Sequence, residues 1–165
     1  MKHTGSENLA LGAILSHDVI NLRLNGREPD ETLAELVDQI KDIAGQPKAR
    51  QTLLRALQER EQLQATNIGD GIALPHARNA LVGLVDRPIV VFGRHDEGIP
   101  YGNDDDTPAR LFFLLVAPSV TQHLALIART SRLLRAPGLR QGLLDAGSPD
   151  TVIGLIREAE AEAEL

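Results

Sequence analysis

The segment Asp70-Gly71-Ile72-Ala73-Leu74-Pro75-His76-Ala77-Arg78 carries the most structural information in this chain. Gly71 and the preceding Gly69 allow a tight turn and the close approach of another backbone. The apolar run 72–74 predicts a brief buried strand, and Pro75, which has no N–H, is expected to stop its hydrogen-bond ladder. The pattern therefore predicts that His76 stands at the end of a strand.

The imidazole of His76 is the first candidate for chemistry. An unperturbed histidine has a pKa of about 6.5 and is mostly uncharged at neutral pH. One nitrogen of the neutral ring then keeps a free lone pair, which can attack phosphorus or bind a metal ion. A histidine after a strand is also often a purely structural residue, so this position alone does not assign a role.

The composition limits what the chain can do. Its 165 residues are enough for one domain with a substantial core. Only 2% of them are aromatic, so the core must be built from Leu, Ile, Val and Ala, and stacking on nucleic-acid bases is not expected. The net charge of −6 disfavours a general binder of polyanions, and we expect no nucleic acid among its partners.

The sequence also indicates a cellular location. It contains no cysteine, which excludes disulfides and thiolate metal sites and favours the cytoplasm. Residues 1–8 are polar and do not resemble a secretion signal, and no apolar run reaches the about 18 residues that a membrane-spanning helix needs. We therefore expect a cytoplasmic protein that meets a membrane only through a transporter partner.

One strand and two helices are predicted before the His76 segment. Residues 19–24 alternate between apolar and polar, which predicts a half-exposed strand with Ile20, Leu22 and Leu24 on one face. Helical spacing then predicts a helix capped by Asp30 or Thr32 and ended by Gly45. Pro47 suits the first turn of a second helix that runs to about Glu59 or Arg60.

Two strands and three helices are predicted after it. Residues 88–92 and 111–116 are continuous apolar runs, as expected for strands covered on both faces by helices. Thr121 can cap a helix that turns His123 inward, a short helix covers about 139–144, and Ser148-Pro149 opens a last helix. Glutamates near the end of that helix oppose its dipole, so we expect the chain to fray from about residue 159.

Several positions share one family pattern: Arg60-Glu61, Thr66, Ile68-Gly69, Gly71-Ile72-Ala73-Leu74-Pro75-His76 and His123-Leu124. They resemble the type-2 enzyme IIA family, the fructose/mannitol class of the bacterial phosphoenolpyruvate-dependent phosphotransferase system, which includes a nitrogen-related regulatory branch. The resemblance implies the mannitol-type enzyme IIA fold, an α/β class three-layer α/β/α sandwich with a mixed central sheet. The length of the chain and the lack of a linker predict a single domain of this family over residues 1–165, and we expect flexible ends at 1–8 and about 159–165.

The same resemblance implies a phosphoryl relay without a cofactor. The histidine phosphocarrier protein would donate a phosphoryl group to His76, which passes it to an enzyme IIB or uses it as a signal to a regulated transporter or kinase. His123 would contact the phosphoryl oxygens or fix the His76 ring, and Arg60 would counter the phosphate charge. Thr66 is expected to add a hydroxyl contact, and Gly69 and Gly71 backbone N–H donors.

Plainer interpretations stay open beside these assignments. His123 could be a hydrogen-bonded core histidine, and Arg60 a cation favourable to a helix C-terminus. His3, His17 and His95 have no comparable context, and we expect loop or surface roles for them. The run Asp104–Asp106 is expected to form a solvated turn, because consecutive side chains diverge and calcium loops use alternating ligands.

Two other functions compete with the relay. The chain could be a binding module that is not phosphorylated, although retention of Arg60, His76 and His123 together argues against this. It could also be a metal hydrolase, but no two histidines lie one helical turn apart. The sequence contains no phosphate-binding loop of the Gly-Lys-Ser/Thr kind, so direct use of ATP is not expected.

Overall fold

The computed structural model describes residues 9–102, 107–163 and 165. Its strands are β1 (Ile20–Asn21), β2 (Asn67–Gly69), β3 (Ile72–Ala73), β4 (Ile89–Ile99) and β5 (Ala109–Val116). Its helices are α2 (Leu11–Ile14), the 3₁₀ turn η1 (His17–Val19), α3 (Pro29–Val37), α4 (Lys41–Ala44), α5 (Pro47–Leu63), α6 (Val120–Leu133), α7 (Leu139–Asp145) and α8 (Pro149–Glu162). The expected features at 1–8 and at Asp104–Asp106 lie outside the described residues.

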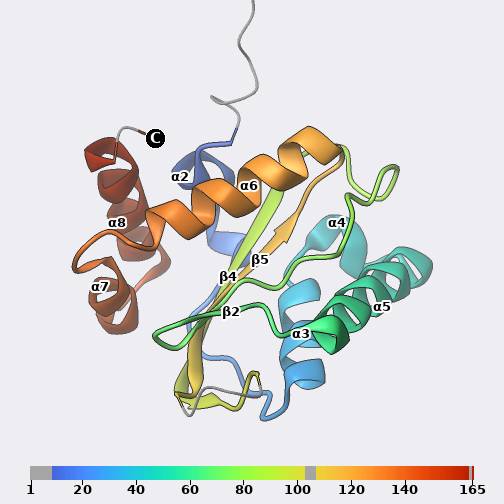
Figure 1. Cartoon of the computed structure of the whole chain (residues 1–165), viewed down its shortest axis with the longest axis horizontal. Coiled ribbons are helices and arrows are strands. Elements are labelled where there is room, and N and C mark those ends of the chain that lie inside the picture. Colours follow the sequence, from blue (N-terminus) through green and yellow to red (C-terminus); the bar gives the residue numbers. More distant parts are fainter. Residues whose placement is uncertain (1–8, 103–106, 164) are drawn as a thin grey trace, which may run out of the picture.

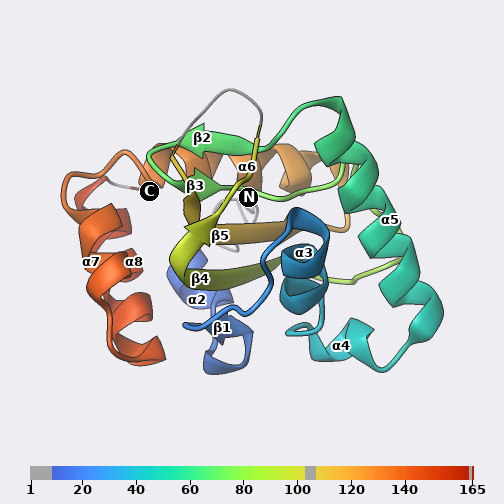
Figure 2. The same ribbon diagram turned by 90° about the horizontal axis from the view of Figure 1, so that it is seen from below.

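The five strands form one mixed sheet in the order β1-β4-β5-β3-β2. β4 and β5 are antiparallel, as are β2 and β3, whereas β1 runs parallel to β4 and β3 runs parallel to β5. The long central pair comes from the two continuous apolar runs of the sequence. Helices lie on both faces of this sheet, with α6, α7 and α8 on one and α3, α4 and α5 on the other (Figures 1 and 2).

Alternation along the strands divides the core between the two faces. On β5, Leu111, Phe113 and Leu115 pack toward α6, α7 and α8, and the intervening Phe112 and Leu114 pack toward α3, α4 and α5. All five side chains are buried, because successive residues of a strand point to opposite faces and both faces are covered. The structure is the expected three-layer α/β/α sandwich with a mixed central sheet.

The segment 19–24 differs from its prediction. Only two of its residues pair as β1, and Ile20 joins the core beside α6 and α8 while Leu24 joins the core beside α3 and α5. The prediction that these side chains share a face is wrong because the chain does not keep strand geometry between them. The N–H of Leu24 nevertheless donates to the carbonyl of Arg94, which continues the contact with β4.

The predicted helix over 30–44 is two helices, α3 and α4. The chain is extended at Ile40, and the Gln39 side chain donates to the carbonyl of Asp18, so tertiary contacts interrupt the helix. The first residue of α3 is Pro29, and neither Asp30 nor Thr32 caps this helix. The prediction for Pro47 is confirmed, and α5 continues past Arg60 to Leu63.

Serine side chains cap α6 and α8, the two long helices of the layer that α6, α7 and α8 form. Ser119, and not the predicted Thr121, accepts the N–H of Gln122 at the start of α6. Ser148 accepts the N–H of Thr151, with Pro149 in the first turn of α8 as expected. The difference at α6 is a matter of register, since both residues are common N-caps.

The last helix does not fray from residue 159 as expected. It continues to Glu162, and Glu160 is only 6% exposed. The Glu160 carboxylate accepts the backbone N–H groups of Leu11 and Gly12 at 2.7 and 3.0 Å and pairs with Arg129 at 3.2 Å. The prediction considered only the unfavourable interaction of this charge with the helix dipole. The partners that stabilise the Glu160 carboxylate come instead from the start of α2 and from α6.

Among the described residues, no helix combines the length and apolar character that spanning a membrane requires.

Candidate functional site

His76 lies at the edge of the sheet, just beyond β3. The expected stop at Pro75 is wrong: the Pro75 carbonyl accepts the N–H of Leu115 at 3.0 Å, and His76 itself forms a parallel bridge with Leu115. Pro75 removes one donor but leaves its carbonyl in the ladder. The pairing with β5 therefore fixes the backbone up to His76.

The His76 ring is held through one of its two nitrogens. Nδ1 lies 2.7 Å from the carbonyl oxygen of Leu74, which can only accept a hydrogen bond. Nδ1 therefore carries the proton of the neutral ring, and Nε2 keeps the free lone pair. The His76 side chain is half-buried.

His123 faces His76 from the first turns of α6. It is 6% exposed, as expected for an inward-pointing residue. The two ring centroids lie 5.9 Å apart with an interplanar angle of 62°, and a hydrogen bond joins His123 to the backbone of Ala77. The predicted pair of histidines is thus brought together across the boundary between the sheet and one helical layer.

Arg60 approaches from the opposite helical layer, near the end of α5. Its Nη1 donates to the carbonyl of Gln64 at 2.5 Å, which caps the last turn of the helix. Arg60, Leu63, Ala77 and Arg78 line a cleft of about 550 Å³ between α5 and the loop after His76. Arg60 therefore serves the helix end as its plain interpretation proposed, and it also lies beside the His76 segment.

Burial lowers the pKa values of both histidines. Desolvation is the largest cause that lowers the pKa of His76, and the charges of Arg60 and His123 lower it further, against the hydrogen bond to Leu74. Desolvation also lowers the pKa of His123, opposed by its hydrogen bond to Ala77. The His76 ring is consequently neutral at pH 7, with Nε2 unprotonated.

Thr66 is buried close to the site but is already engaged. Its N–H and hydroxyl donate to the two carboxylate oxygens of Glu61, and its carbonyl accepts the N–H of Leu74. The buried Tyr101 hydroxyl donates to the same carboxylate at 2.8 Å. The sequence predicted no role for Glu61 or Tyr101, since 40 residues separate them and no local pattern connects them.

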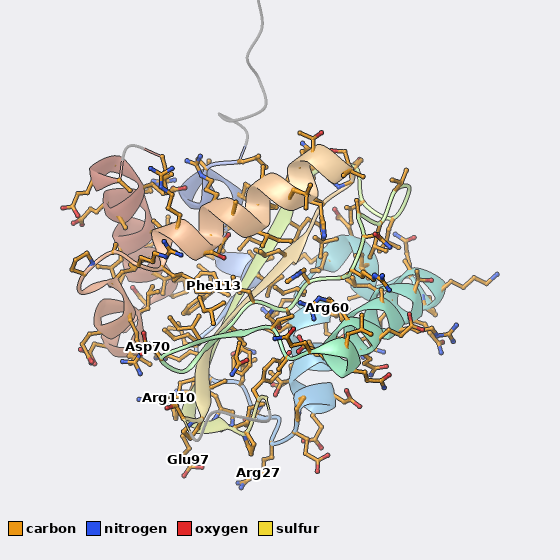
Figure 3. All side chains as sticks on the ribbon, in the orientation of Figure 1. Arg27, Arg60, Asp70, Glu97, Arg110 and Phe113 are labelled. Atoms are coloured by element: carbon orange, nitrogen blue, oxygen red, sulfur yellow. The ribbon has the colours of Figure 1, made fainter. Side chains whose placement is uncertain are left out.

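Gly69 and Gly71 lie elsewhere. They form the turn between β2 and β3 with Asp70, all three at positive φ, and His76 follows the other end of β3, roughly 16 Å away at strand rise. Figure 3 shows Asp70 far from Arg60. The turn is pinned instead by Arg140, which donates to the Asp70 carbonyl, so the structure does not bring these glycines to His76.

The remaining histidines have structural partners. His95 is buried on β4, against the expected loop or surface role, and its Nδ1 accepts the N–H groups of Glu97 and Gly98. His17 is exposed and pairs with Asp150 at 2.5 Å, and His3 lies outside the described residues. Within residues 9–102, 107–163 and 165, no three side chains of the metal-ligating types gather into a group.

A neutral imidazole beside a second imidazole and a guanidinium defines a class of site. The free nitrogen can attack an electrophile, and its neighbours can balance negative charge on that electrophile, as phosphoryl transfer requires. The model of one family, "Phosphoenolpyruvate-dependent sugar phosphotransferase system, EIIA 2", matches residues 13–159. The chain belongs to this family, the type-2 enzyme IIA domains of the phosphotransferase system.

Individual relatives agree with this assignment. The chain is 35% identical over 136 residues to the fructose-specific EIIA component of Haloferax volcanii, covering 79% of this chain and 86% of that protein. It is also 35% identical over 147 residues to the fructose-specific EIIABC component of Bacillus subtilis, covering 88% of this chain. The match spans only 22% of the Bacillus protein.

Solved structures share the fold. The nitrogen regulatory protein IIA-Ntr of Neisseria meningitidis superposes with a TM-score of 0.75 at 22% identity, covering 88% of this chain and 98% of that one. The enzyme IIA of Escherichia coli in its complex with phosphorylated mannitol enzyme IIB superposes with a TM-score of 0.74 at 24% identity, covering 87% and 97%. The fold is therefore the mannitol-type enzyme IIA fold expected from the sequence.

Proposed function

We propose that this chain is a phosphocarrier whose acceptor atom is His76 Nε2. The observation that carries the proposal is the hydrogen bond from His76 Nδ1 to the Leu74 carbonyl, which leaves Nε2 as the nucleophile. The donor is the histidine phosphocarrier protein of the phosphotransferase system. The acceptor is an enzyme IIB, or the phosphorylated state itself acts on a regulated transporter or kinase, as in the nitrogen-related branch.

The transfer is a direct exchange of one P–N bond for another. The Nε2 lone pair attacks phosphorus in line, the bond from phosphorus to the donor's histidine breaks, and its electron pair returns to the donor ring. The phosphoryl oxygens keep their negative charge throughout. The Arg60 guanidinium and the His123 ring stabilise that charge, and the buried surroundings strengthen their effect.

Exposed apolar side chains support docking of a protein donor. Leu63 on α5, Val82 in the loop after His76, and Val120 and Leu124 on α6 are 61–78% exposed. They come from the same three segments that carry or border Arg60, His76 and His123. Isolated exposed apolar residues are ordinary, but a set of them around a nucleophile suits a transient partner that must approach it closely.

Intact-mass spectrometry tests the proposal. The protein is incubated with phosphoenolpyruvate, enzyme I and the histidine phosphocarrier protein, in parallel with His76→Ala and with His17→Ala as a control at an exposed histidine. We expect one acid-labile phosphoryl group on the wild type and on His17→Ala, none on His76→Ala, and slower acceptance by His123→Ala. Equal phosphorylation of wild type and His76→Ala overturns the proposal, and no phosphorylation of any protein favours the unphosphorylated binding module.

A further inference from the structure

The Glu61 carboxylate is the centre of a partly buried hydrogen-bond cluster near the proposed acceptor, His76. It accepts the Thr66 N–H at 2.9 Å, the Thr66 hydroxyl at 2.5 Å and the Tyr101 hydroxyl at 2.8 Å. Thr66 and Tyr101 are 5% and 4% exposed. The charge is thus satisfied by three donors, and hydrogen bonds to a carboxylate are stronger than those between neutral groups.

This cluster is connected to His76 by two further hydrogen bonds. The Thr66 carbonyl accepts the N–H of Leu74 at 3.0 Å, and the Leu74 carbonyl accepts the Nδ1–H of His76 at 2.7 Å. The N–H of Leu74 is therefore bound to Thr66, and the carbonyl of Leu74 is bound to the His76 imidazole. A displacement of residue 66 moves the carbonyl that selects the His76 tautomer.

The other side of the cluster is anchored in the core. The Tyr101 ring packs edge-on against Phe112 of β5, with ring centroids 5.4 Å apart. β5 also pairs with the His76 segment through Leu115. Tyr101 and His76 therefore both contact the central strand β5. Through its hydrogen bond with Tyr101, Glu61 connects that strand to the end of α5 that carries Arg60.

We propose that Glu61, held by Tyr101, is a positioning residue of the acceptor site. It fixes Thr66, which fixes Leu74, which keeps the His76 ring with Nδ1 protonated and Nε2 free. Glu61 acts through these residues and does not touch the phosphoryl group. The inference rests on the proposed function for its kinetic consequence, while its structural consequence, the tautomer of His76, exists in the unphosphorylated protein.

The test separates hydrogen bonding from charge and from fold. Glu61→Met keeps the length of the side chain and removes every acceptor, Glu61→Gln keeps an acceptor without the charge, and Glu158→Met makes the same exchange at an exposed glutamate. Nitrogen-15 NMR of the imidazoles at about pH 8 reports the tautomer of neutral His76. The rate of phosphorylation by phosphoramidate, a small donor that needs no docking surface, reports acceptor reactivity.

We expect the wild type and Glu158→Met to show the Nδ1–H tautomer alone. Glu61→Met should show a mixture of tautomers and react about tenfold more slowly, as misplacement of a reacting group costs, and Glu61→Gln should recover most of both. Tyr101→Phe, which removes one of the three donors and keeps the ring contact with Phe112, should fall between Glu61→Gln and Glu61→Met. It also replaces Glu61→Met if circular dichroism shows that variant to be unfolded.

Three results overturn the inference. Glu61→Met could fold and keep the wild-type tautomer of His76, or Tyr101→Phe could react more slowly with an unchanged tautomer. Alternatively, Glu61→Gln could react as slowly as Glu61→Met. The last of these would assign the effect to charge. A wild type that accepts no phosphoryl group refutes the proposed function instead. The tautomers would still decide whether Glu61 positions His76.

Discussion

At the scale of single residues, His76 combines a fixed nitrogen with a free one. The Leu74 carbonyl selects the tautomer, while burial and the positive charge of Arg60 lower the pKa of His76. These two effects serve the same end, since a protonated imidazole has no lone pair to offer. In the proposed function, these surroundings prepare His76 as the nucleophile before any partner binds.

The lowered pKa of His76 predicts the pH dependence of acceptance. The rate should decline as the pH falls and Nε2 becomes protonated, with a midpoint below 6.5, the ordinary histidine value. His76 and His123 bind protons more readily when unfolded, so the free energy of unfolding should also decrease as the pH drops below about 6.5. Carbon-13 NMR titration of both imidazoles checks this, and a midpoint for His76 at or above 6.5 contradicts it.

Arg60→Gln should change two observables in opposite directions. Loss of the guanidinium removes stabilisation of the phosphoryl oxygens and should slow acceptance by about 10²-fold. It also removes a positive charge that repels the proton on His76, so the pKa of His76 should rise. Arg55→Gln, at an exposed position on the same helix, is the matched control. An unchanged His76 pKa in Arg60→Gln would show that the two side chains do not interact.

The sequence reaches part of this site. His76, His123 and Arg60 are predicted because each stands in a recognisable local pattern. The structure places His123 against His76 and Arg60 beside the segment that follows His76. Gly69 and Gly71 belong to the same motif, but their turn lies at the opposite end of β3. Glu61 and Tyr101 could not be connected from the sequence, because only the folded sheet brings position 101 beside the end of α5.

At the scale of elements, Glu160 joins α8, α2 and α6. Replacing it with Ala leaves the Arg129 charge and two N–H groups of α2 without their acceptor in a buried place. Breaking a buried pair on one side costs about 3–5 kcal/mol, so Glu160→Ala should lower the free energy of urea unfolding by about that amount. The exposed Glu162→Ala should change it by less than about 0.5 kcal/mol. Equal stability of the two variants would contradict the importance of this junction.

Helices and strands were predictable where the pattern is local and long. Pro47 and Pro149 at helix starts and the two apolar strands needed only neighbouring residues. The break between α3 and α4 depends on Gln39 reaching Asp18, and the persistence of α8 depends on Glu160 reaching residues 11 and 12. Contacts between remote segments leave no periodic pattern of apolar residues in the sequence, so these features could not be predicted from it.

At the scale of the whole molecule, the proposed docking of a protein donor on the exposed apolar side chains of α5, α6 and the loop after His76 can be tested. Leu124→Asp should slow acceptance from the histidine phosphocarrier protein by about tenfold, because a charge must then be buried in the complex. Acceptance from phosphoramidate should be unchanged. Ile68→Asp, an exposed apolar position on β2, is the control. Equal slowing with both donors would mean that Leu124 acts on the histidine itself.

The three side chains of the acceptor site come from three different layers. Arg60 belongs to α5 on one face of the sheet, His123 belongs to α6 on the other face, and His76 extends from the strand between them. A slip of either layer over the sheet, even one that leaves each helix intact, would separate the proposed phosphoryl acceptor from a group proposed to neutralise the phosphoryl charge. The rate of phosphoryl acceptance should therefore depend on how well the three layers are aligned. A distortion of any layer should abolish acceptance before the protein unfolds.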